Sequence, residues 1–244
     1  MKRIKTMIEA VKTENLNKIY GNIKATDNFN FSAHKGEIIA LLGPNGAGKS
    51  TLMNMLAGFS APTSGKILIE GMDIWEHPQE AKAKIGFLPE GSPLYPDMSV
   101  KMFLKYMAGL RQVGKTEIEK AVSMAKIENV SEQKIETLSK GYLRRVGFAQ
   151  SILSNPDILL LDEPTDGLDP NQKEHMRSLI TQMGKNKTII ISTHLLEEAE
   201  NICTRIILIN KGKIMADGTL AEILAAADAE NLAAAFKKLT RTEE

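Results

Sequence analysis

The chain contains a glycine-rich octapeptide, residues 43–50, whose composition suits phosphate binding. It reads Gly-Pro-Asn-Gly-Ala-Gly-Lys-Ser and lies between an apolar run and a helix-like stretch, residues 49–56. Glycines let the backbone curl so that its N–H groups point at anionic oxygens, and a following helix adds the positive end of its dipole. In such a loop Lys49 reaches the β- and γ-phosphates, and the Ser50 hydroxyl ligates Mg²⁺. The octapeptide predicts a nucleoside-triphosphate site rather than a glycine turn with an incidental lysine.

Two adjacent carboxylates, Asp162 and Glu163, follow a second apolar run at residues 158–161. A buried strand delivers its last residues to the carboxyl edge of a sheet, where ligands bind in α/β proteins. There Asp162 is placed to hold Mg²⁺, directly or through water. Glu163 can orient a water beside the γ-phosphate and accept its proton. The alternative is that both acids cap the helix expected after Pro170, but a phosphate loop on the same chain favours the chemical roles.

A third apolar run, residues 188–193, ends at His194. A single histidine is usually structural or solvated. Because this one ends a strand of a phosphate-binding sheet, we expect it near the γ-phosphate, where it would hold the phosphate, the water and Glu163 in one arrangement. The remaining histidines have no such setting and are expected on the surface: His34, His77 and His175.

The bulk composition excludes several classes of protein. The chain has 244 residues, enough for one large domain or a domain with a subdomain, and its net charge is only +1 from 31 basic and 30 acidic residues. Without a basic excess we expect no nucleic-acid partner. No apolar run approaches the roughly 18–20 residues that cross a bilayer, and no secretory signal is expected. The one cysteine, Cys203, is interpreted as a small buried hydrophobe in a reducing compartment.

The order of elements predicts an α/β fold with a mostly parallel, covered sheet. The first part of the chain alternates like strands and leads into the phosphate loop, which predicts an N-terminal antiparallel β subdomain. After Pro156, strands alternate with helices. The expected strands are residues 7–11, 23–32, 66–70, 158–162, 188–193 and 206–209, and the expected later helices are residues 172–183 and 195–200.

Between these parts, residues 91–155 predict a helical insertion. Val100, Phe103, Leu104 and Met107 follow the i, i+3, i+4, i+7 spacing of an amphipathic helix. Further helices are expected at residues 116–126, capped by Thr116, and at residues 139–153. We therefore divide the chain into a domain at residues 7–218 and an alanine-rich tail at residues 219–244, which forms one or two helices over residues 220–239.

The segment Leu-Ser-Lys-Gly-Tyr at residues 138–142, followed by basic residues, resembles the Leu-Ser-Gly-Gly-Gln signature of ATP-binding-cassette (ABC) ATPases. The resemblance covers residues 8–218 and includes six motifs in the family's order. It implies a P-loop NTPase fold whose ATP-binding residues are Tyr20, which stacks on adenine, and Gly43, Pro44, Asn45, Gly46, Ala47, Gly48, Lys49, Ser50 and Thr51. It also implies Mg²⁺ ligands at Ser50, Asp162 and Glu90, Glu163 as the general base, His194 as the switch histidine, and Asp169 in a loop that crosses to a partner subunit.

The same resemblance implies that the chain works as one half of a pair. Ser139 is a good helix cap, and with the backbone N–H of Gly141 it forms an anion site that has no phosphate loop beside it. In this family the signature, here Ser139, Lys140 and Gly141, closes on the γ-phosphate bound by the other subunit. A homodimer with two-fold symmetry is the simplest arrangement, and a heterodimer with a homologous cassette is the alternative.

Two positions depart from the family's pattern. Glu90 replaces the usual glutamine, and a carboxylate can also coordinate Mg²⁺, so we expect it to sense the metal; a tolerated variant is the bland interpretation. The signature has Lys140 for glycine and Tyr142 for glutamine. Because Ser139 and Gly141 remain, we expect a working signature.

The closest resemblance is to ABC-2-type exporter cassettes with separate membrane subunits, of the gliding-motility and multidrug kind. We therefore expect an ATPase that uses ATP and Mg²⁺ to drive integral membrane subunits from the cytoplasmic face of the membrane. The alternatives are a soluble non-transport ABC ATPase and a nucleotide-binding regulator. The residues expected to receive a cytoplasmic helix of the membrane subunit, unless they only pack their own loop, are Pro93, Leu94, Tyr95 and Met98.

Overall fold

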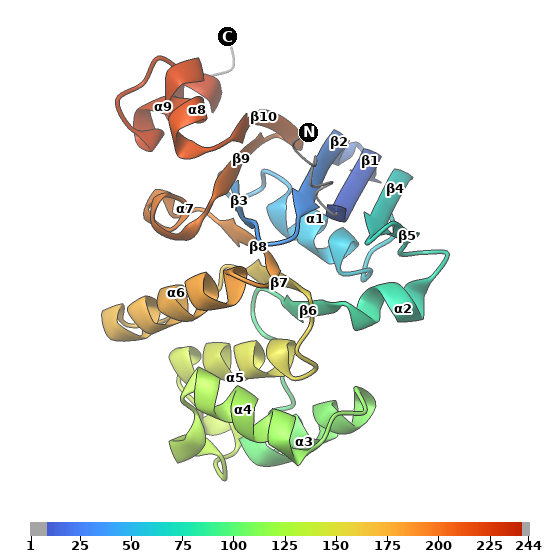
Figure 1. The fold of residues 1–244 in the computed structure, drawn as a ribbon, viewed down its shortest axis with the longest axis vertical. Helices are drawn as coiled ribbons and strands as arrows, with labels where there is room; N and C mark the ends of the chain where they lie inside the picture. Colours follow the sequence, from blue (N-terminus) through green and yellow to red (C-terminus); the bar gives the residue numbers. More distant parts are fainter. Residues whose placement is uncertain (1–8, 241–244) are drawn as a thin grey trace, which may run out of the picture.

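The chain folds around two β-sheets, which the computed structural model describes over residues 9–240 (Figure 1). The smaller sheet is antiparallel and has the strand order β2-β1-β4-β5. Its strands are β1 (Glu9–Tyr20), β2 (Ile23–His34), β4 (Ser64–Ile69) and β5 (Met72–Asp73). The antiparallel subdomain expected at the N-terminus is therefore confirmed, although the strand expected at residues 7–11 begins outside the described residues.

The larger sheet has the order β10-β9-β3-β8-β7-β6, and its first five strands along the chain are parallel. β10 adds one antiparallel edge. The central strands β3, β7 and β8 are fully buried, as their runs of mostly Ile and Leu predict. The strands are β3 (Ile38–Leu42), β6 (Ile85–Leu88), β7 (Ile158–Asp162), β8 (Thr188–Thr193), β9 (Arg205–Asn210) and β10 (Lys213–Gly218).

Three neighbouring strands of this sheet end at the same edge. In the register of the sheet Leu42 pairs with Thr193 and Asp162 pairs with Ser192, so β3, β8 and β7 finish level with one another. The phosphate loop, the two carboxylates and His194 follow directly from these ends. The parallel pairing therefore brings together segments that lie more than a hundred residues apart in the sequence.

Helices cover both faces of the larger sheet and divide the core into parts. α1 (Lys49–Leu56) packs between the two sheets through four fully buried side chains, those of residues 52, 53, 55 and 56. On the opposite face lie α6 (Pro170–Gly184) and the helical block. α7 (Leu196–Ile202) packs with the tail helices α8 (Leu220–Ala226) and α9 (Leu232–Thr240) over β3 and β9. Short α2 (Pro78–Ala83) precedes β6.

The helical block contains α3 (Val100–Leu110), α4 (Lys115–Ala125) and α5 (Lys140–Ile152), at the lower end of Figure 1. As the spacing predicts, Val100, Phe103 and Leu104 are buried. The predicted cap Thr116 is wrong, because α4 begins one residue earlier and Gly114 is its cap; the Gly114 N–H donates to Glu117 Oε2 at 3.2 Å. The Glu117 side chain thus satisfies the N–H of the cap residue itself.

Two of the three histidines expected on the surface are half-buried instead. His34 ends β2 at the turn into β3, and the His175 ring nitrogen Nε2 lies 3.0 Å from the carbonyl oxygen of Met124. His77 is exposed, as expected. Cys203 is half-buried as well, and burial, with a smaller effect of the Glu198 charge, raises the pKa of its thiol above the usual range. The burial of these side chains depends on contacts between distant segments, which the local sequence pattern does not predict.

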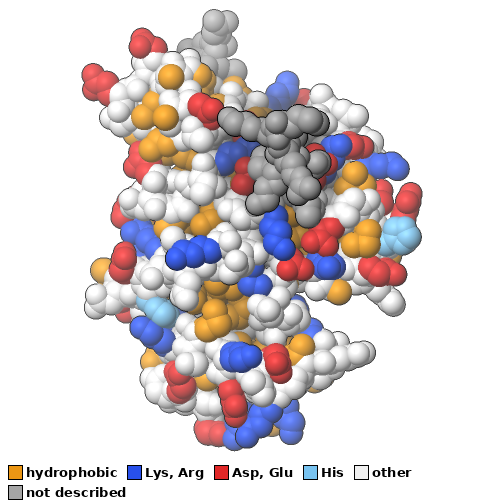
Figure 2. Space-filling view, in the orientation of Figure 1, with side chains coloured by type: hydrophobic (Ala, Val, Ile, Leu, Met, Phe, Trp, Pro, Cys, Tyr) orange, Lys and Arg blue, Asp and Glu red, His pale blue; other side chains and the backbone are white. Residues whose placement is uncertain are grey.

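On the face shown in Figure 2, acidic and basic side chains are interspersed rather than gathered by sign. Within residues 9–240, no helix combines the length and the apolar character needed to cross a membrane.

Candidate nucleotide-binding site

The backbone of the glycine-rich loop approaches its neighbours too closely to allow a side chain at Gly48. Gly48 has a φ of 104°, and a Cβ placed on it would lie 2.1 Å from the carbonyl oxygen of Ala25. Gly46 also has a positive φ, 79°, but a Cβ there would meet nothing within 4 Å. The loop therefore wraps closely against β2 at Gly48 and stays open to solvent at Gly46. This open side leaves space for an anion above the N-terminus of α1.

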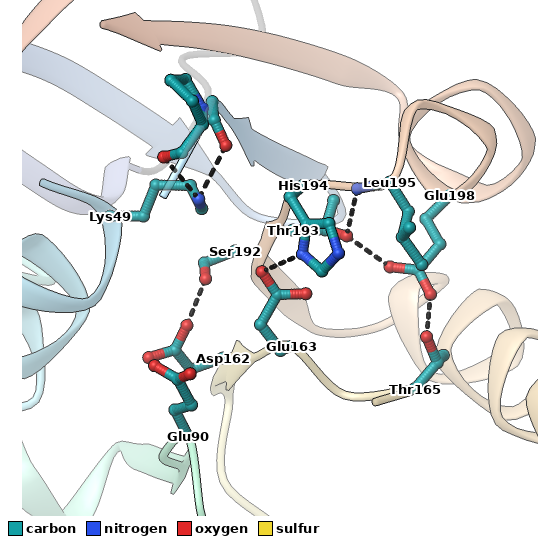
Figure 3. Close-up of polar contacts among 12 residues, drawn as sticks. Lys49, Glu90, Asp162, Glu163, Thr165, Ser192, Thr193, His194, Leu195 and Glu198 are labelled. Atoms are coloured by element: carbon teal, nitrogen blue, oxygen red, sulfur yellow. Dashed lines mark hydrogen bonds and ion pairs between the residues drawn. The ribbon is translucent and has the colours of Figure 1, made fainter. Parts of the chain in front are cut away.

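The Lys49 side chain folds back over its own loop. It is only 6% exposed, and its Nζ donates to the carbonyl oxygens of Gly43 at 2.7 Å and Pro44 at 3.2 Å (Figure 3). Burial lowers the pKa of the Lys49 amine, while the charges of Glu163, Asp162 and Glu90 act in the opposite direction. The ammonium is thus held at the loop with acidic groups on the other side of the site.

A cavity of about 600 Å³ opens above the loop, within the size range of small-molecule sites. Tyr20 stands at its rim with half of its surface exposed, and Lys18 Nζ lies 4.9 Å from the centre of the ring. Asp162 and His194 do not line the cavity; His194 contacts Glu163, which does. The predicted site residues that line it are Tyr20, Asn45, Gly46, Gly48, Lys49, Ser50, Thr51, Glu90 and Glu163.

Three side chains with oxygen atoms that could ligate a metal come from different segments, and two of them, Ser50 and Glu90, line this cavity. Asp162 is 1% exposed, and its Oδ1 accepts a hydrogen bond from the Ser192 hydroxyl. Ser50 Oγ lies 3.4 Å from Glu90 Oε2. Within residues 9–240, no three or more His, Cys, Asp and Glu side chains form a metal cage of their own. Mg²⁺ at nucleotide sites takes only one or two protein carboxylates together with phosphate oxygens and waters, so Ser50, Asp162 and Glu90 fit it.

Glu163 and His194 form a pair at the ends of adjacent strands. His194 Nδ1 lies 2.9 Å from Glu163 Oε1, and the backbone N–H of Glu163 donates to the Ser192 carbonyl at 2.9 Å (Figure 3). Burial raises the pKa of the Glu163 carboxyl, against the lowering effect of His194 and Lys49. Glu163 also has a φ of 51°, which non-glycine residues rarely adopt. A carboxylate with a raised pKa, held on a strained backbone, is suited to accept a proton.

The structure does not bring the signature to this cavity. Ser139 is exposed and caps α5, with its Oγ accepting from the Tyr142 N–H at 3.4 Å. Gly141 packs so closely that a Cβ would lie 2.7 Å from the Gln172 side chain. Asp169 caps α6, its Oδ1 accepting from the Gln172 N–H at 2.9 Å. This cap satisfies the helix that Asp162 and Glu163 were alternatively expected to serve.

Arg144 is a residue at the site that sequence reasoning counted only among the basic residues after the signature. It is 5% exposed and donates to the carbonyl oxygens of Pro89, at 2.7 Å, and Asp162, and to Ser92 Oγ at 3.1 Å. One guanidinium therefore joins α5 to the segments that carry Glu90 and Asp162. The signal in the sequence is weak, because a basic side chain on a helix is usually exposed.

Comparison with known proteins assigns this geometry to a family. The sequence profile of the ABC transporter family matches residues 26–166. The chain belongs to this family. It is an ATP-binding cassette of the ABC ATPase class, and it resembles an uncharacterized ABC transporter ATP-binding protein, MJ1023, of Methanocaldococcus jannaschii, with 39% identity over 87% of this chain and 79% of that protein.

Two further relatives have names that refer to export. The cassette is 36% identical to a Nod factor export ATP-binding protein I of Burkholderia orbicola, over 86% of this chain and 71% of that protein. It is 37% identical to YbhF of Escherichia coli, described as a probable multidrug ABC transporter ATP-binding protein, over 88% of this chain. The match spans only 37% of the length of that relative.

Solved structures agree with the family and with the fold. The cassette matches an ATP-binding subunit of an ABC transporter with a TM-score of 0.88 and 26% identity, over 95% of this chain and all of that one. It also matches the cassette MJ0796 in a dimeric, post-hydrolysis state bound to ADP and Pi, with a TM-score of 0.77 and 27% identity, over 86% of this chain and 98% of that one. The predicted P-loop NTPase fold is confirmed.

Proposed function

We propose that this cassette hydrolyses ATP to drive separate membrane subunits of an ABC-2-type exporter, from the cytoplasmic face of the membrane. One observation carries the catalytic part of the proposal. The loop ammonium of Lys49, the buried Asp162 and the Glu163–His194 pair meet at one edge of a parallel sheet. The export names of the relatives favour the transport part.

The reaction follows from the positions of these groups. Water attacks the γ-phosphorus, the bond to the β–γ bridging oxygen breaks, and the proton of the water goes to Glu163. His194 holds the Glu163 carboxylate through the 2.9 Å contact. Lys49 and the loop N–H groups stabilise the negative charge that develops on the phosphates. Ser50 and Asp162, with Glu90 nearby, would hold Mg²⁺, which would neutralise further negative charge on the phosphates.

The proposed catalytic unit is a pair of cassettes. Ser139, Lys140 and Gly141 lie outside the cavity of their own chain, and Ser139 is exposed. A second copy, or a homologous cassette, would bring its signature to the γ-phosphate bound here. Dimeric structures of the structurally similar cassette MJ0796 support this arrangement.

The proposed contact with a membrane subunit is an apolar groove of about 450 Å³ between the larger sheet and α3. Pro93 and Leu94, two of the four residues expected to receive a membrane helix, line it. The Tyr95 ring packs elsewhere, with its centre 5.9 Å from that of Phe103 and 5.8 Å from that of Tyr106. Phe59 also lines the groove and leaves 76% of its surface exposed. An exposed aromatic beside an apolar groove is the kind of anchor that protein interfaces use.

The test is capture of a membrane protein with the tagged cassette from detergent-solubilised membranes. We expect Phe59→Glu to lose the captured membrane subunit while the detached cassette keeps its ATPase activity. Met215→Glu is the matched control, because Met215 is an exposed hydrophobic residue on β10, away from the groove. If neither the wild type nor the control captures an integral membrane protein, the transport part of the proposal is wrong.

A further inference from the structure

Glu198 is a buried carboxylate that is linked to Glu163 and His194 through two threonine side chains. It lies in α7 and is 1% exposed. Its Oε2 accepts a hydrogen bond from the Thr193 hydroxyl at 2.7 Å, and its Oε1 accepts one from the Thr165 hydroxyl (Figure 3). Thr193 is next to His194 in the chain, and Thr165 is two residues from Glu163.

Thr193 immediately precedes His194, and its hydroxyl makes two hydrogen bonds. It donates to Glu198 and accepts from the backbone N–H of Leu195 at 3.1 Å. The second bond spans His194 and closes the turn that carries it. The backbone at His194 is therefore fixed from both sides by one hydroxyl.

Thr165 follows Glu163 by two residues, in a turn whose backbone is strained. Glu163 has a φ of 51°, and such conformations persist only where the surroundings determine them. The Asp166 N–H donates to the Glu163 carbonyl at 3.1 Å, and the Thr165 side chain is anchored to Glu198. The anchor at Thr165 and the bond from Glu163 N–H to Ser192 therefore hold the turn at both ends.

The environment of Glu198 indicates a role beyond packing. A buried carboxylate is costly unless its oxygens are hydrogen-bonded or paired with a cation. Among residues 9–240, Glu198 forms no ion pair with a basic side chain; its described side-chain partners are the two threonine hydroxyls. It lies in the first turn of α7, where the helix dipole favours negative charge.

We propose that Glu198 is a positioning residue that holds Glu163 and His194 in their reactive arrangement by binding Thr165 and Thr193. The inference rests on the proposed roles of Glu163 and His194. Loss of either hydroxyl releases one end of the arrangement, so the 2.9 Å contact between His194 and Glu163 is no longer fixed. A misplacement of about 1 Å at a reacting group can cost roughly 100-fold in rate.

The test compares Thr193→Val and Thr165→Val with the corresponding serine variants. Valine keeps the shape of threonine and removes the hydroxyl, whereas serine keeps the hydroxyl. We expect kcat to fall about 10- to 100-fold in the valine variants with KM for ATP unchanged, and to recover to within about twofold of the wild type in the serine variants. Combining Thr193→Val with Glu198→Leu should slow turnover no further than Glu198→Leu alone, because the leucine already removes the oxygen that accepts the Thr193 hydroxyl.

Thr188→Val is the matched control. Thr188 lies at the other end of β8, is 1% exposed, and donates its hydroxyl to the His34 carbonyl at 3.2 Å. Its variant loses a buried hydroxyl of the same strand and should keep the wild-type kcat. The positioning role is overturned if all three valine variants have the same kcat. It is also overturned if the losses of kcat in the two single variants add up in the double variant.

Thermal unfolding of each variant and the wild type checks that the protein stays folded. If the threonine variants unfold, Glu198→Leu alone decides, because leucine is close to glutamate in size and accepts no hydrogen bond: a kcat like that of the wild type overturns the inference. Glu163→Gln separates this inference from the proposed function. Loss of turnover in Glu163→Gln with normal turnover in Thr165→Val and Thr193→Val rejects only the positioning role, whereas full turnover in Glu163→Gln rejects both.

Discussion

The charges of single side chains divide the site into two parts. Lys49 presents an ammonium that two backbone carbonyls hold at the loop, while Asp162 and Glu163 present carboxylates from the neighbouring strand. Nucleotide phosphates would pair with the first and a divalent cation with the second. The sequence predicted these residues because loop and strand ends carry recognisable residue types. It did not predict Arg144 or Glu198, whose partners lie 18 to 55 and 5 to 33 residues away.

At this scale, Lys49→Ala should weaken ATP binding at least 10-fold, because a charge-assisted hydrogen bond to phosphate contributes about 1.5–3 kcal/mol. Isothermal titration calorimetry with ATP measures the loss of affinity. Lys187→Ala is the control, since Lys187 also donates to two backbone carbonyls, those of Asn155 and Pro156, but far from the loop. Equal affinity in Lys49→Ala and wild type would contradict the role given to Lys49.

Glu90 gives a second test at the residue scale. Its Oε2 lies 3.4 Å from Ser50 Oγ, so a carboxylate stands where the family usually has an amide. We expect Glu90→Gln to shift the Mg²⁺ concentration that gives half-maximal ATP turnover upward, because the amide lacks the negative charge that attracts the cation. Superimposable Mg²⁺ curves for the two proteins would show that Glu90 does not sense the metal.

At the scale of elements, parallel pairing does most of the positioning. β3, β7 and β8 end level, and the loop, the carboxylates and His194 follow from their ends. Buried apolar runs made these strands predictable from sequence. The starts of helices were less predictable from sequence. Helix α4 begins at Lys115, where the Glu117 side chain satisfies the Gly114 N–H, and Thr116 is not its cap. The position of a cap depends on which side chain reaches a given N–H. The sequence alone does not distinguish two neighbouring positions at which the helix could begin.

The loop itself provides the prediction at this scale. Gly48→Ala should disrupt ATP binding and destabilise the protein by more than Gly46→Ala does. The added Cβ at residue 48 meets the Ala25 carbonyl at 2.1 Å, whereas at residue 46 it meets nothing within 4 Å. Gly46→Ala should therefore cost only the strain of a positive φ, about 1 kcal/mol. Denaturant unfolding of both variants measures the difference, and equal losses of stability would refute the close approach at Gly48.

At the scale of the whole molecule, our proposal makes the cassette half of a composite site. The nucleotide cavity and the signature lie on different parts of one chain, and Ser139 faces solvent. The motif order in the sequence was enough to predict the family and the P-loop fold. The contact with a second cassette depends on a surface, and a single sequence shows neither its shape nor its partner.

Ser139→Arg is the prediction that follows for the pair. The added side chain would block the approach of a second cassette but leave the cavity of its own chain intact, because residue 139 does not line it. We expect ATP affinity of the isolated cassette to stay as in the wild type and hydrolysis to be lost. Weaker ATP binding by the monomer would mean that the signature acts within its own chain.

The central claim is that ATP is held between two cassettes, and the mass of the Glu163→Gln variant tests it most directly. Sedimentation equilibrium should give one cassette without nucleotide and a pair with two bound ATP in Mg²⁺ and ATP, because this variant binds but does not hydrolyse. Glu163→Gln combined with Ser139→Arg should bind ATP and remain single. A single cassette with bound ATP in Glu163→Gln, both alone and with the subunits that co-purify with it, would contradict the account.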